Sequence, residues 1–275
     1  MNVKKEIITS RTNPLVVSVA KLKDRAEREK TGMFCCDGSK LVLEYIKNCG
    51  APRYIFVDKD SAKRYLPELE ALEDGTKELE VTLVSDSVFS KLTEQKAPEG
   101  IMCVGERNKL SYGKMSDALV SDVSDERILM LASLRDTGNV GTVIRTALAL
   151  GYDRVVMSDD CADVLSPKTL RASMGAVFMM NITTSDDLAA CVRSFTESGR
   201  RVFAGELRAN SVSLEELQLK GSDIFIIGNE GHGIDSDVSH ACSASVYIPI
   251  SHLSESLNAA SAATVFMWHQ RTFAK

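Results

Sequence analysis

The C-terminal half of the chain alternates between short apolar runs and longer stretches with helical spacing. The apolar runs predict buried strands at residues 128–134, 154–158, 176–182, 201–206, 224–228 and 245–250. Apolar residues at helical spacing predict helices at residues 140–150, 167–174, 186–198, 235–241 and 256–271. Strands and helices in alternation predict an α/β fold with a parallel sheet and helices on both of its faces.

The N-terminal half predicts a smaller α/β unit. Its predicted elements are a basic helix at 16–30, a strand at 34–36, a helix at 38–47, a strand at 53–58, an acidic helix near 66–72, and strands near 81–84 and 101–105. The polar stretch that follows is typical of a linker. We therefore expect one domain over residues 1–107, a linker over 108–126 and a second domain over 127–275.

The composition supports a folded protein with a full core. The chain has 275 residues, 44% of them hydrophobic, which suits one large domain or two ordinary ones. No apolar run reaches the ~18 residues that a membrane span needs, and the N-terminus lacks a signal-peptide pattern. Seven cysteines without a C-x-x-C pair are typical of neither a disulfide framework nor a zinc site. We expect a reduced, cytoplasmic protein with no membrane partner and no metal.

The charge is distributed unevenly along the chain. A net charge of −5 argues mildly against nonspecific nucleic-acid binding through bulk charge. Residues 1–53, however, hold eleven Lys or Arg against six Asp or Glu. A local basic surface of this kind can contact phosphates, although the basic helix could equally be a solvated amphipathic one.

The first of three loops with unusual chemistry follows the strand at 128–134. Ligands of parallel sheets bind at such carboxyl ends of strands. The loop leads into a helix pattern that starts at Asn139, a residue that often caps helices. Within that helix Arg145 shares a face with three small residues, Gly141, Thr142 and Ala149. A cation above small residues is well placed to meet an anion, although a solvated surface arginine gives the same pattern.

The second and third loops also follow predicted strands. The second loop, Gly228–Gly233, has three glycines, so a ligand can lie against bare backbone, and Glu230 is its only carboxylate. In the third loop Ser256 and Asn258 precede a helix of small residues, where free N–H groups can face a ligand. The alternatives are an ordinary glycine turn and a tightly packed helix. No P-loop, full G-x-G-x-x-G or H-E-x-x-H motif is present.

Taken in order, the three loops resemble the signature motifs of the SpoU/TrmH RNA ribose 2′-O-methyltransferases. The matching motifs are Asn139-x-Gly141-x-x-x-Arg145, Gly228-x-Glu230-Gly231-x-Gly233, and Ile248-Pro249 with Ser256-Leu257-Asn258. Residues 166–176 are similar to the stretch between the family's first two motifs, and residues 8–14 and 34–38 to its L30e-like substrate-binding domain. Each motif is weak by itself, but their order and spacing are specific.

The resemblance implies a fold, a cofactor and an assembly. The second domain would be a SPOUT-type α/β domain with a mostly parallel sheet and a trefoil knot, preceded by a small L30e-like α/β domain. The cofactor would be S-adenosyl-L-methionine, held bent in the knot against the residues Gly228, Gly233, Ile248, Pro249 and Leu257. Members of the family are homodimers, with the site near the subunit boundary.

The resemblance also implies roles for individual residues. The positions of the family's polar catalytic residues are taken by Asn139, Arg145, Glu230, Ser256 and Asn258. The residues expected to contact RNA are Ser10, Arg11, Asn13, Lys21, Lys23 and Arg171. Arg145 would orient a phosphate or stabilise negative charge on the ribose oxygen. Glu230 would accept the proton or orient the target through Asn139, and no metal is needed.

The implied substrate is structured RNA, and analogy favours ribosomal RNA, such as 23S rRNA, over transfer RNA. The sequence departs from the family pattern at His252, where many members have Gly, at Ala259, which replaces a common Val, and at Asp37, which replaces Glu. Three alternatives stay open. They are a transfer-RNA 2′-O-methyltransferase, an RNA-binding protein of the same fold without catalysis, and a nucleotide-dependent α/β enzyme such as a dehydrogenase.

Overall fold

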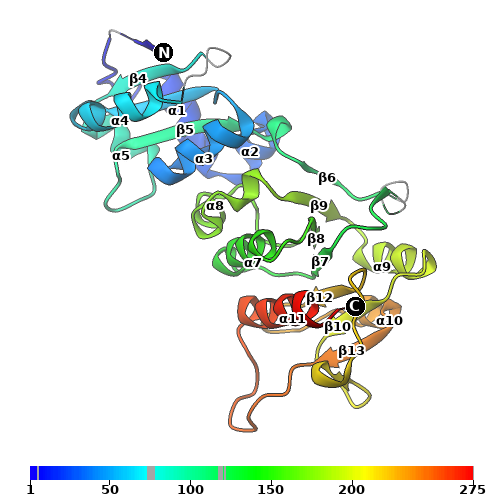
Figure 1. The fold of residues 1–275 in the computed structure, drawn as a ribbon. Coiled ribbons are helices and arrows are strands. Elements are labelled where there is room, and N and C mark those ends of the chain that lie inside the picture. Colours follow the sequence, from blue (N-terminus) through cyan, green and yellow to red (C-terminus); the bar gives the residue numbers. More distant parts are fainter. Residues whose placement is uncertain (5, 73–77, 117–119, 121, 275) are drawn as a thin grey trace. The chain divides into compact units, whose positions relative to one another are not determined.

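Figure 1 shows the chain in a computed structural model that describes residues 1–4, 6–72, 78–116, 120 and 122–274. The described residues form two compact units. Unit 1 comprises residues 1–110 and 163–179, and unit 2 comprises residues 111–162 and 180–275. The chain therefore leaves unit 2 at residue 163 and returns to it at residue 180. No helix of the described residues is long and apolar enough to cross a membrane.

Unit 1 is built on a mixed sheet whose described strands have the order β1-β4-β3-β5-β2. These strands are β1 (Asn2–Val3), β2 (Met33–Asp37), β3 (Tyr54–Asp58), β4 (Glu80–Val84) and β5 (Ile101–Glu106). Strands β1, β4 and β3 are parallel, whereas β5 runs antiparallel to both β3 and β2. The helices are α1 (Pro14–Ala20), α2 (Arg25–Thr31), α3 (Ser39–Cys49), α4 (Ala62–Glu70), α5 (Asp86–Leu92) and α8 (Pro167–Ser173). The predicted small α/β unit is confirmed.

The single basic helix predicted over residues 16–30 is wrong, because α1 and α2 are separate helices. A 3-10 turn over residues 21–23 follows α1, and Asp24 then has an extended backbone with a ψ of 133°. The break buries Arg28, whose guanidinium donates to the carbonyl groups of Leu22 and Lys23 at 2.7 and 2.6 Å. A charged side chain thus satisfies the backbone of the turn that separates the two helices.

Helix α8 and the turn after it add a ring cluster to unit 1. Phe178 stacks on Phe34 with 6.4 Å between ring centroids and meets Tyr45 edge-on at 5.4 Å. The strand predicted at 176–182 is therefore wrong in its first half, where residues 176–178 form a 3-10 turn. Left-handed backbone directly after α8 redirects this apolar run into the core of unit 1.

Unit 2 is built on a large parallel sheet. Its described strands have the order β11-β13-β10-β12-β7-β8-β9-β6, and each described pairing between them is parallel. They are β6 (Tyr112–Lys114), β7 (Ile128–Leu131), β8 (Arg154–Ser158), β9 (Asn181–Ser185), β10 (Val202–Gly205), β11 (Val212–Ser213), β12 (Ile224–Ile227) and β13 (Ala244–Tyr247). The predicted parallel sheet is confirmed. Strand β6, however, lies in the stretch predicted as a linker and pairs with β9 at the edge of the sheet.

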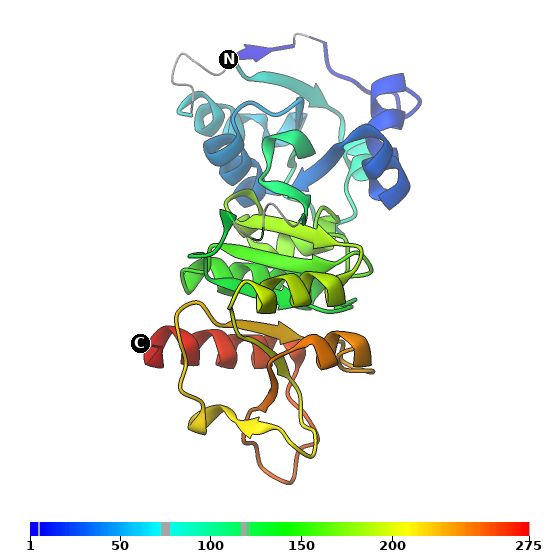
Figure 2. The same cartoon turned by 90° about the vertical axis from the view of Figure 1, so that its right-hand side faces the viewer.

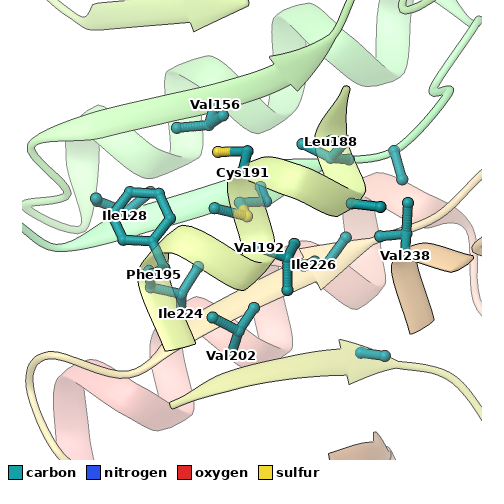
Figure 3. Close-up of a cluster of buried hydrophobic side chains, with 14 of the residues drawn as sticks. Ile128, Val156, Leu188, Cys191, Val192, Phe195, Val202, Ile224, Ile226 and Val238 are labelled. Carbon is teal, nitrogen blue, oxygen red and sulfur yellow. The ribbon is translucent and has the colours of Figure 1, made fainter. Parts of the chain in front are cut away.

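Helices cover both faces of this sheet, as predicted. They are α7 (Thr137–Ala149), α9 (Leu188–Glu197), α10 (Ser236–Ala241) and α11 (Ala259–Phe273). Along β12, Ile224 and Ile226 join the core beneath α9 and α10 (Figure 3). Phe225, on the opposite face, packs against Phe266 of α11 at 4.8 Å between ring centroids. Figure 2 shows α11, in red, as a long helix that ends at the C-terminus. The threading of a knot stays a prediction.

Candidate active site

The loop after β7 positions Asn139. Asp136 has an extended backbone and caps α7, because its Oδ1 accepts a hydrogen bond from the backbone N–H of Asn139 at 2.7 Å. The prediction that Asn139 caps this helix is therefore wrong, and the helix begins at Thr137, inside the loop. Since Asn139 lies in the first turn and is not the cap, its side-chain amide is available for contacts with other loops.

The side chain of Asn139 links all three predicted loops. Its Nδ2 donates to Oε1 of Glu230 in the glycine-rich loop at 2.6 Å. Its Oδ1 accepts a hydrogen bond from Nδ2 of Asn258 at 3.1 Å. Asn258 in turn caps α11, because its Oδ1 accepts from the backbone N–H groups of Ala260 and Ser261 at 2.9 and 3.2 Å. Three segments that are far apart in sequence thus converge on one chain of polar side chains within unit 2.

The glycine-rich loop is a tight turn held by its own backbone. Asn229 and Gly233 exchange two backbone hydrogen bonds of 2.9 and 3.0 Å. The side chain of Asn229 donates to the carbonyl of Ser133 at 2.8 Å and so ties this loop to the one after β7. A Cβ on Gly228 would lie 2.6 Å from the carbonyl carbon of Gly233, which is too close for any side chain. The turn therefore requires glycine at position 228.

A cavity of about 560 Å³ lies at the carboxyl ends of β10 and β13, and of the three loops only the third lines it. This volume is in the range of small-molecule sites, roughly 300–1,000 Å³. Of the residues predicted to hold a cofactor, the cavity is lined by Ile248, Pro249 and Leu257, and Ser256 lies there too. Gly228 and Gly233 are not among its lining residues; they form the adjacent turn. The structure thus brings together most, though not all, of the predicted cofactor residues.

Sequence reasoning missed Glu206, which follows β10 and lines this cavity. Its side chain is only 14% exposed and forms an ion pair with Arg208 at 2.7 Å. An acidic residue at the carboxyl end of a predicted strand was the available signal, because ligands of parallel sheets bind at that edge.

Arg145 does not join the polar chain around Asn139. It is exposed on α7 and has no hydrogen bond or ion pair in the described part of the chain. It is six positions from Asn139, so the two side chains point about 120° apart around the helix. Within one chain, therefore, no described contact connects Arg145 to Glu230 or Asn258.

Electrostatics also shape the loop after β7. Partial burial works to raise the pKa of the Asp160 carboxyl, but hydrogen bonds from Ser158, Ser133 and Arg135 outweigh it and lower this pKa. Asp160 is therefore a stable anion beside the strand end that carries the loop. In the described ranges, no group of three or more His, Cys, Asp or Glu side chains could hold a metal ion.

The residues predicted to contact RNA in unit 1 have different surroundings. Arg11 and Lys21 are exposed. Asn13 caps α1, because its Oδ1 accepts from the N–H of Leu15 at 2.9 Å, and Lys23 donates to two backbone carbonyl groups. The remaining two are Ser10, which is exposed, and Arg171, whose Nη1 is buried without a described partner. Only part of this set is therefore free to meet an RNA phosphate.

Comparison with known proteins agrees with this geometry. Residues 126–268 match the profile of the SpoU rRNA Methylase family, and residues 13–103 match that of the MRM3-like substrate binding domain. The chain is 32% identical to the 23S rRNA (guanosine(2553)-2'-O)-methyltransferase RlmP of Bacillus subtilis, over 96% of this chain and 98% of that protein. The first match includes all three predicted loops.

Solved structures give the same result. The AdoMet-bound rRNA methyltransferase from Sinorhizobium meliloti superposes with a TM-score of 0.82 and 26% identity, and 98% of each chain is covered. The SpoU methyltransferase AviRb from Streptomyces viridochromogenes, in complex with AdoMet, has a TM-score of 0.78 at 20% identity over 94% of this chain and 98% of that one, which shows a shared fold. This chain belongs to the SpoU rRNA methylase family.

Proposed function

We propose that the protein is an S-adenosyl-L-methionine-dependent methyltransferase that acts on a ribose 2′-hydroxyl of structured RNA, with ribosomal RNA favoured over transfer RNA. The observation that carries this proposal is the convergence of Asn139, Glu230 and Asn258, of which Asn258 directly follows Leu257 in the wall of a cavity of about 560 Å³. The preference for ribosomal RNA is supported by the relative RlmP, which is named as a 23S rRNA methyltransferase.

The residues around the cavity fit the cofactor. The apolar wall formed by Ile248, Pro249 and Leu257 suits the faces of an adenine ring, and Gly228 allows the tight turn against Gly233 that shapes the neighbouring loop. Gly233 closes the turn against Gly228 through its backbone. When bound, S-adenosyl-L-methionine supplies an electrophilic methyl group on a sulfonium. The protein then has to align the ribose oxygen and assist its loss of a proton.

Glu230 and the two asparagines are suited to orient and deprotonate the ribose hydroxyl. A 2′-hydroxyl is a weak nucleophile near neutral pH, so a nearby acceptor for its proton raises its reactivity. Glu230 provides a carboxylate whose Oε1 is fixed by the Asn139 amide, which leaves its Oε2 as a candidate acceptor. Asn258 fixes Asn139 in turn, and Ser256, which lines the cavity, is a candidate contact to the nucleotide.

Arg145 acts as an electrostatic group in this proposal. A guanidinium stays protonated because its pKa lies above ~12, so it cannot be the base. It can instead hold a phosphate of the RNA and stabilise negative charge that develops on the ribose oxygen. Its exposed position on α7 suits contact with a large ligand.

We further infer that the protein is a homodimer. Helix α11 carries exposed apolar side chains at Val265, Trp268 and Phe273, with 38%, 54% and 56% of their surface exposed. Helix α11 also packs against α7, which carries Arg145. Burial of this apolar face against a second copy would remove it from water and place Arg145 near the boundary between subunits.

Unit 1 would anchor the RNA in this scheme, through exposed cations such as Arg11 and Lys21. A cytoplasmic location belongs to the same proposal. It is supported by the ribosomal RNA named for the relative and by the seven cysteines, none of which forms a disulfide in the described residues.

The decisive experiment is transfer of a labelled methyl group from S-adenosyl-L-methionine to ribosomal or transfer RNA by the purified protein. Nucleotides are then mapped for 2′-O-methylation in RNA from cells with and without the gene. We expect label in ribosomal RNA and one 2′-O-methyl site that depends on the gene. RNA binding without release of S-adenosylhomocysteine would favour the non-catalytic alternative, label only in transfer RNA would change the substrate, and binding of a nicotinamide cofactor would point to a dehydrogenase.

A further inference from the structure

Glu206 combines a position in the cavity with an unusually fixed carboxylate. It follows β10, and its backbone N–H donates to the carbonyl of Val246 on the neighbouring β13 at 3.0 Å. Its side chain is 14% exposed and lines the cavity. A carboxylate so withdrawn from water requires donors to remain charged.

All of the described donors to this carboxylate act on one of its two oxygens. Oε1 accepts from the hydroxyl of Ser245 at 2.9 Å and from the hydroxyl of Ser239, and it forms an ion pair with Nε of Arg208 at 2.7 Å. Oε2 accepts no hydrogen bond from the described residues. The donors therefore fix the orientation of the carboxylate and leave one anionic oxygen for a ligand. An ionised carboxylate only accepts hydrogen bonds, so the matching ligand group must be a donor.

The strand order indicates which part of the cofactor lies nearest to Glu206. Strand β10 lies between β13, which leads to Ile248, and β12, which leads to Gly228. The proposed function places the cofactor against both of these positions. A ligand that extends from one to the other crosses the end of β10 with its middle part, and the middle of S-adenosyl-L-methionine is the ribose, with two adjacent hydroxyl donors.

We propose that Glu206 is a specificity-determining residue whose Oε2 accepts a hydrogen bond from the ribose 2′- or 3′-hydroxyl of the cofactor. This inference rests on the proposed function, since it assumes that this cofactor binds in this cavity. It extends the site by a residue outside the three signature loops. Among the ionisable side chains that line the cavity, which also include His252 and Glu255, Glu206 is the one at the end of β10.

The test measures binding by calorimetry, without catalysis. S-adenosylhomocysteine and its 2′-deoxy and 3′-deoxy analogues are titrated into the full-length protein and into Glu206→Gln. We expect the wild type to bind at least one deoxy analogue about ten- to hundredfold more weakly, the loss typical of a hydrogen bond to a charged group. In Glu206→Gln, removal of the same ribose hydroxyl from the ligand should weaken binding by less than about threefold. Glu197→Gln, which removes an exposed carboxylate at the end of α9, should behave like the wild type.

The wild-type measurement is decisive even if the variant does not fold. If both deoxy analogues bind the wild type as tightly as S-adenosylhomocysteine, the proposal is overturned. It is also overturned if Glu206→Gln weakens all ligands equally and retains the penalty for the missing hydroxyl, because Glu206 then acts only as a structural link. Titration of 5′-methylthioadenosine, which keeps the ribose but lacks the amino-acid part, must show the same effect of Glu206→Gln; no effect would assign Glu206 to the ammonium group. A wild type that binds none of these ligands would instead contradict the proposed function.

Discussion

At the scale of single residues, Gly228 is the position in the site that tolerates substitution least. A Cβ there would lie 2.6 Å from the backbone of Gly233, so Gly228→Val must displace the glycine-rich loop. We expect the affinity for S-adenosyl-L-methionine, measured by calorimetry, to fall about tenfold or more. Gly113→Val is the matched control, because a Cβ in this exposed part of β6 meets nothing within 4 Å. Unchanged affinity in Gly228→Val would show that the loop does not border the cofactor.

Arg145 tests the chemistry without disturbing the fold. It is exposed and has no described partner, so Arg145→Ala should change the free energy of unfolding by no more than about 0.5 kcal/mol. We expect unchanged affinity for the cofactor and a loss of methyl transfer of about 100-fold or more, the loss typical when one group that stabilises developing charge is removed. The control is Arg193→Ala on α9, another exposed arginine. Near-normal turnover in Arg145→Ala would remove Arg145 from the mechanism.

At the scale of elements, the period of the apolar residues predicted the parallel sheet and its helices, but it could not choose the residue that caps α7. Asp136 and Asn139 are both favourable N-cap residues, and they lie three positions apart. The choice matters because it leaves the Asn139 amide free to contact Glu230 and Asn258, which are 91 and 119 positions away in the chain. Local patterns predict the three loops, whereas the contacts between them depend on the tertiary fold.

The cap itself can be tested. Asp136→Ala removes the acceptor for the backbone N–H of Asn139 and should lower the free energy of unfolding by about 1 kcal/mol in urea titrations. Asp136→Asn keeps an acceptor at the same position and should lose a few tenths of that amount. If the two variants are equally stable, Asp136 is not the residue that stabilises the first turn of α7.

At the scale of the whole molecule, the two compact units do not correspond to two continuous stretches of sequence. The two family profiles match residues 13–103 and 126–268, as continuous stretches, yet residues 163–179 form a compact unit with the N-terminal part. Helical spacing identified α8 but could not predict which core it joins, because the spacing shows which face of a helix is buried and not which domain covers that face. The assignment rests on particular side chains, above all Phe178 among the rings of unit 1 and Asp163 beside Arg28.

This arrangement predicts that unit 1 is incomplete without its second segment. The guanidinium of Arg28 is 5% exposed and pairs with Asp163 at 2.5 Å, and Phe178 completes the ring cluster. A fragment of residues 1–110 alone would lose that ion pair and the contact of Phe178 with the rings of Phe34 and Tyr45, and both losses lower its stability. We therefore expect the fragment of residues 1–110 to unfold at a lower urea concentration than the same fragment joined by a flexible linker to residues 163–179. Adding Asp163→Asn and Phe178→Ala to the joined fragment should abolish the gain. Equal stability of the fragments with and without residues 163–179 would mean that this segment contacts the rest of unit 1 but does not stabilise it.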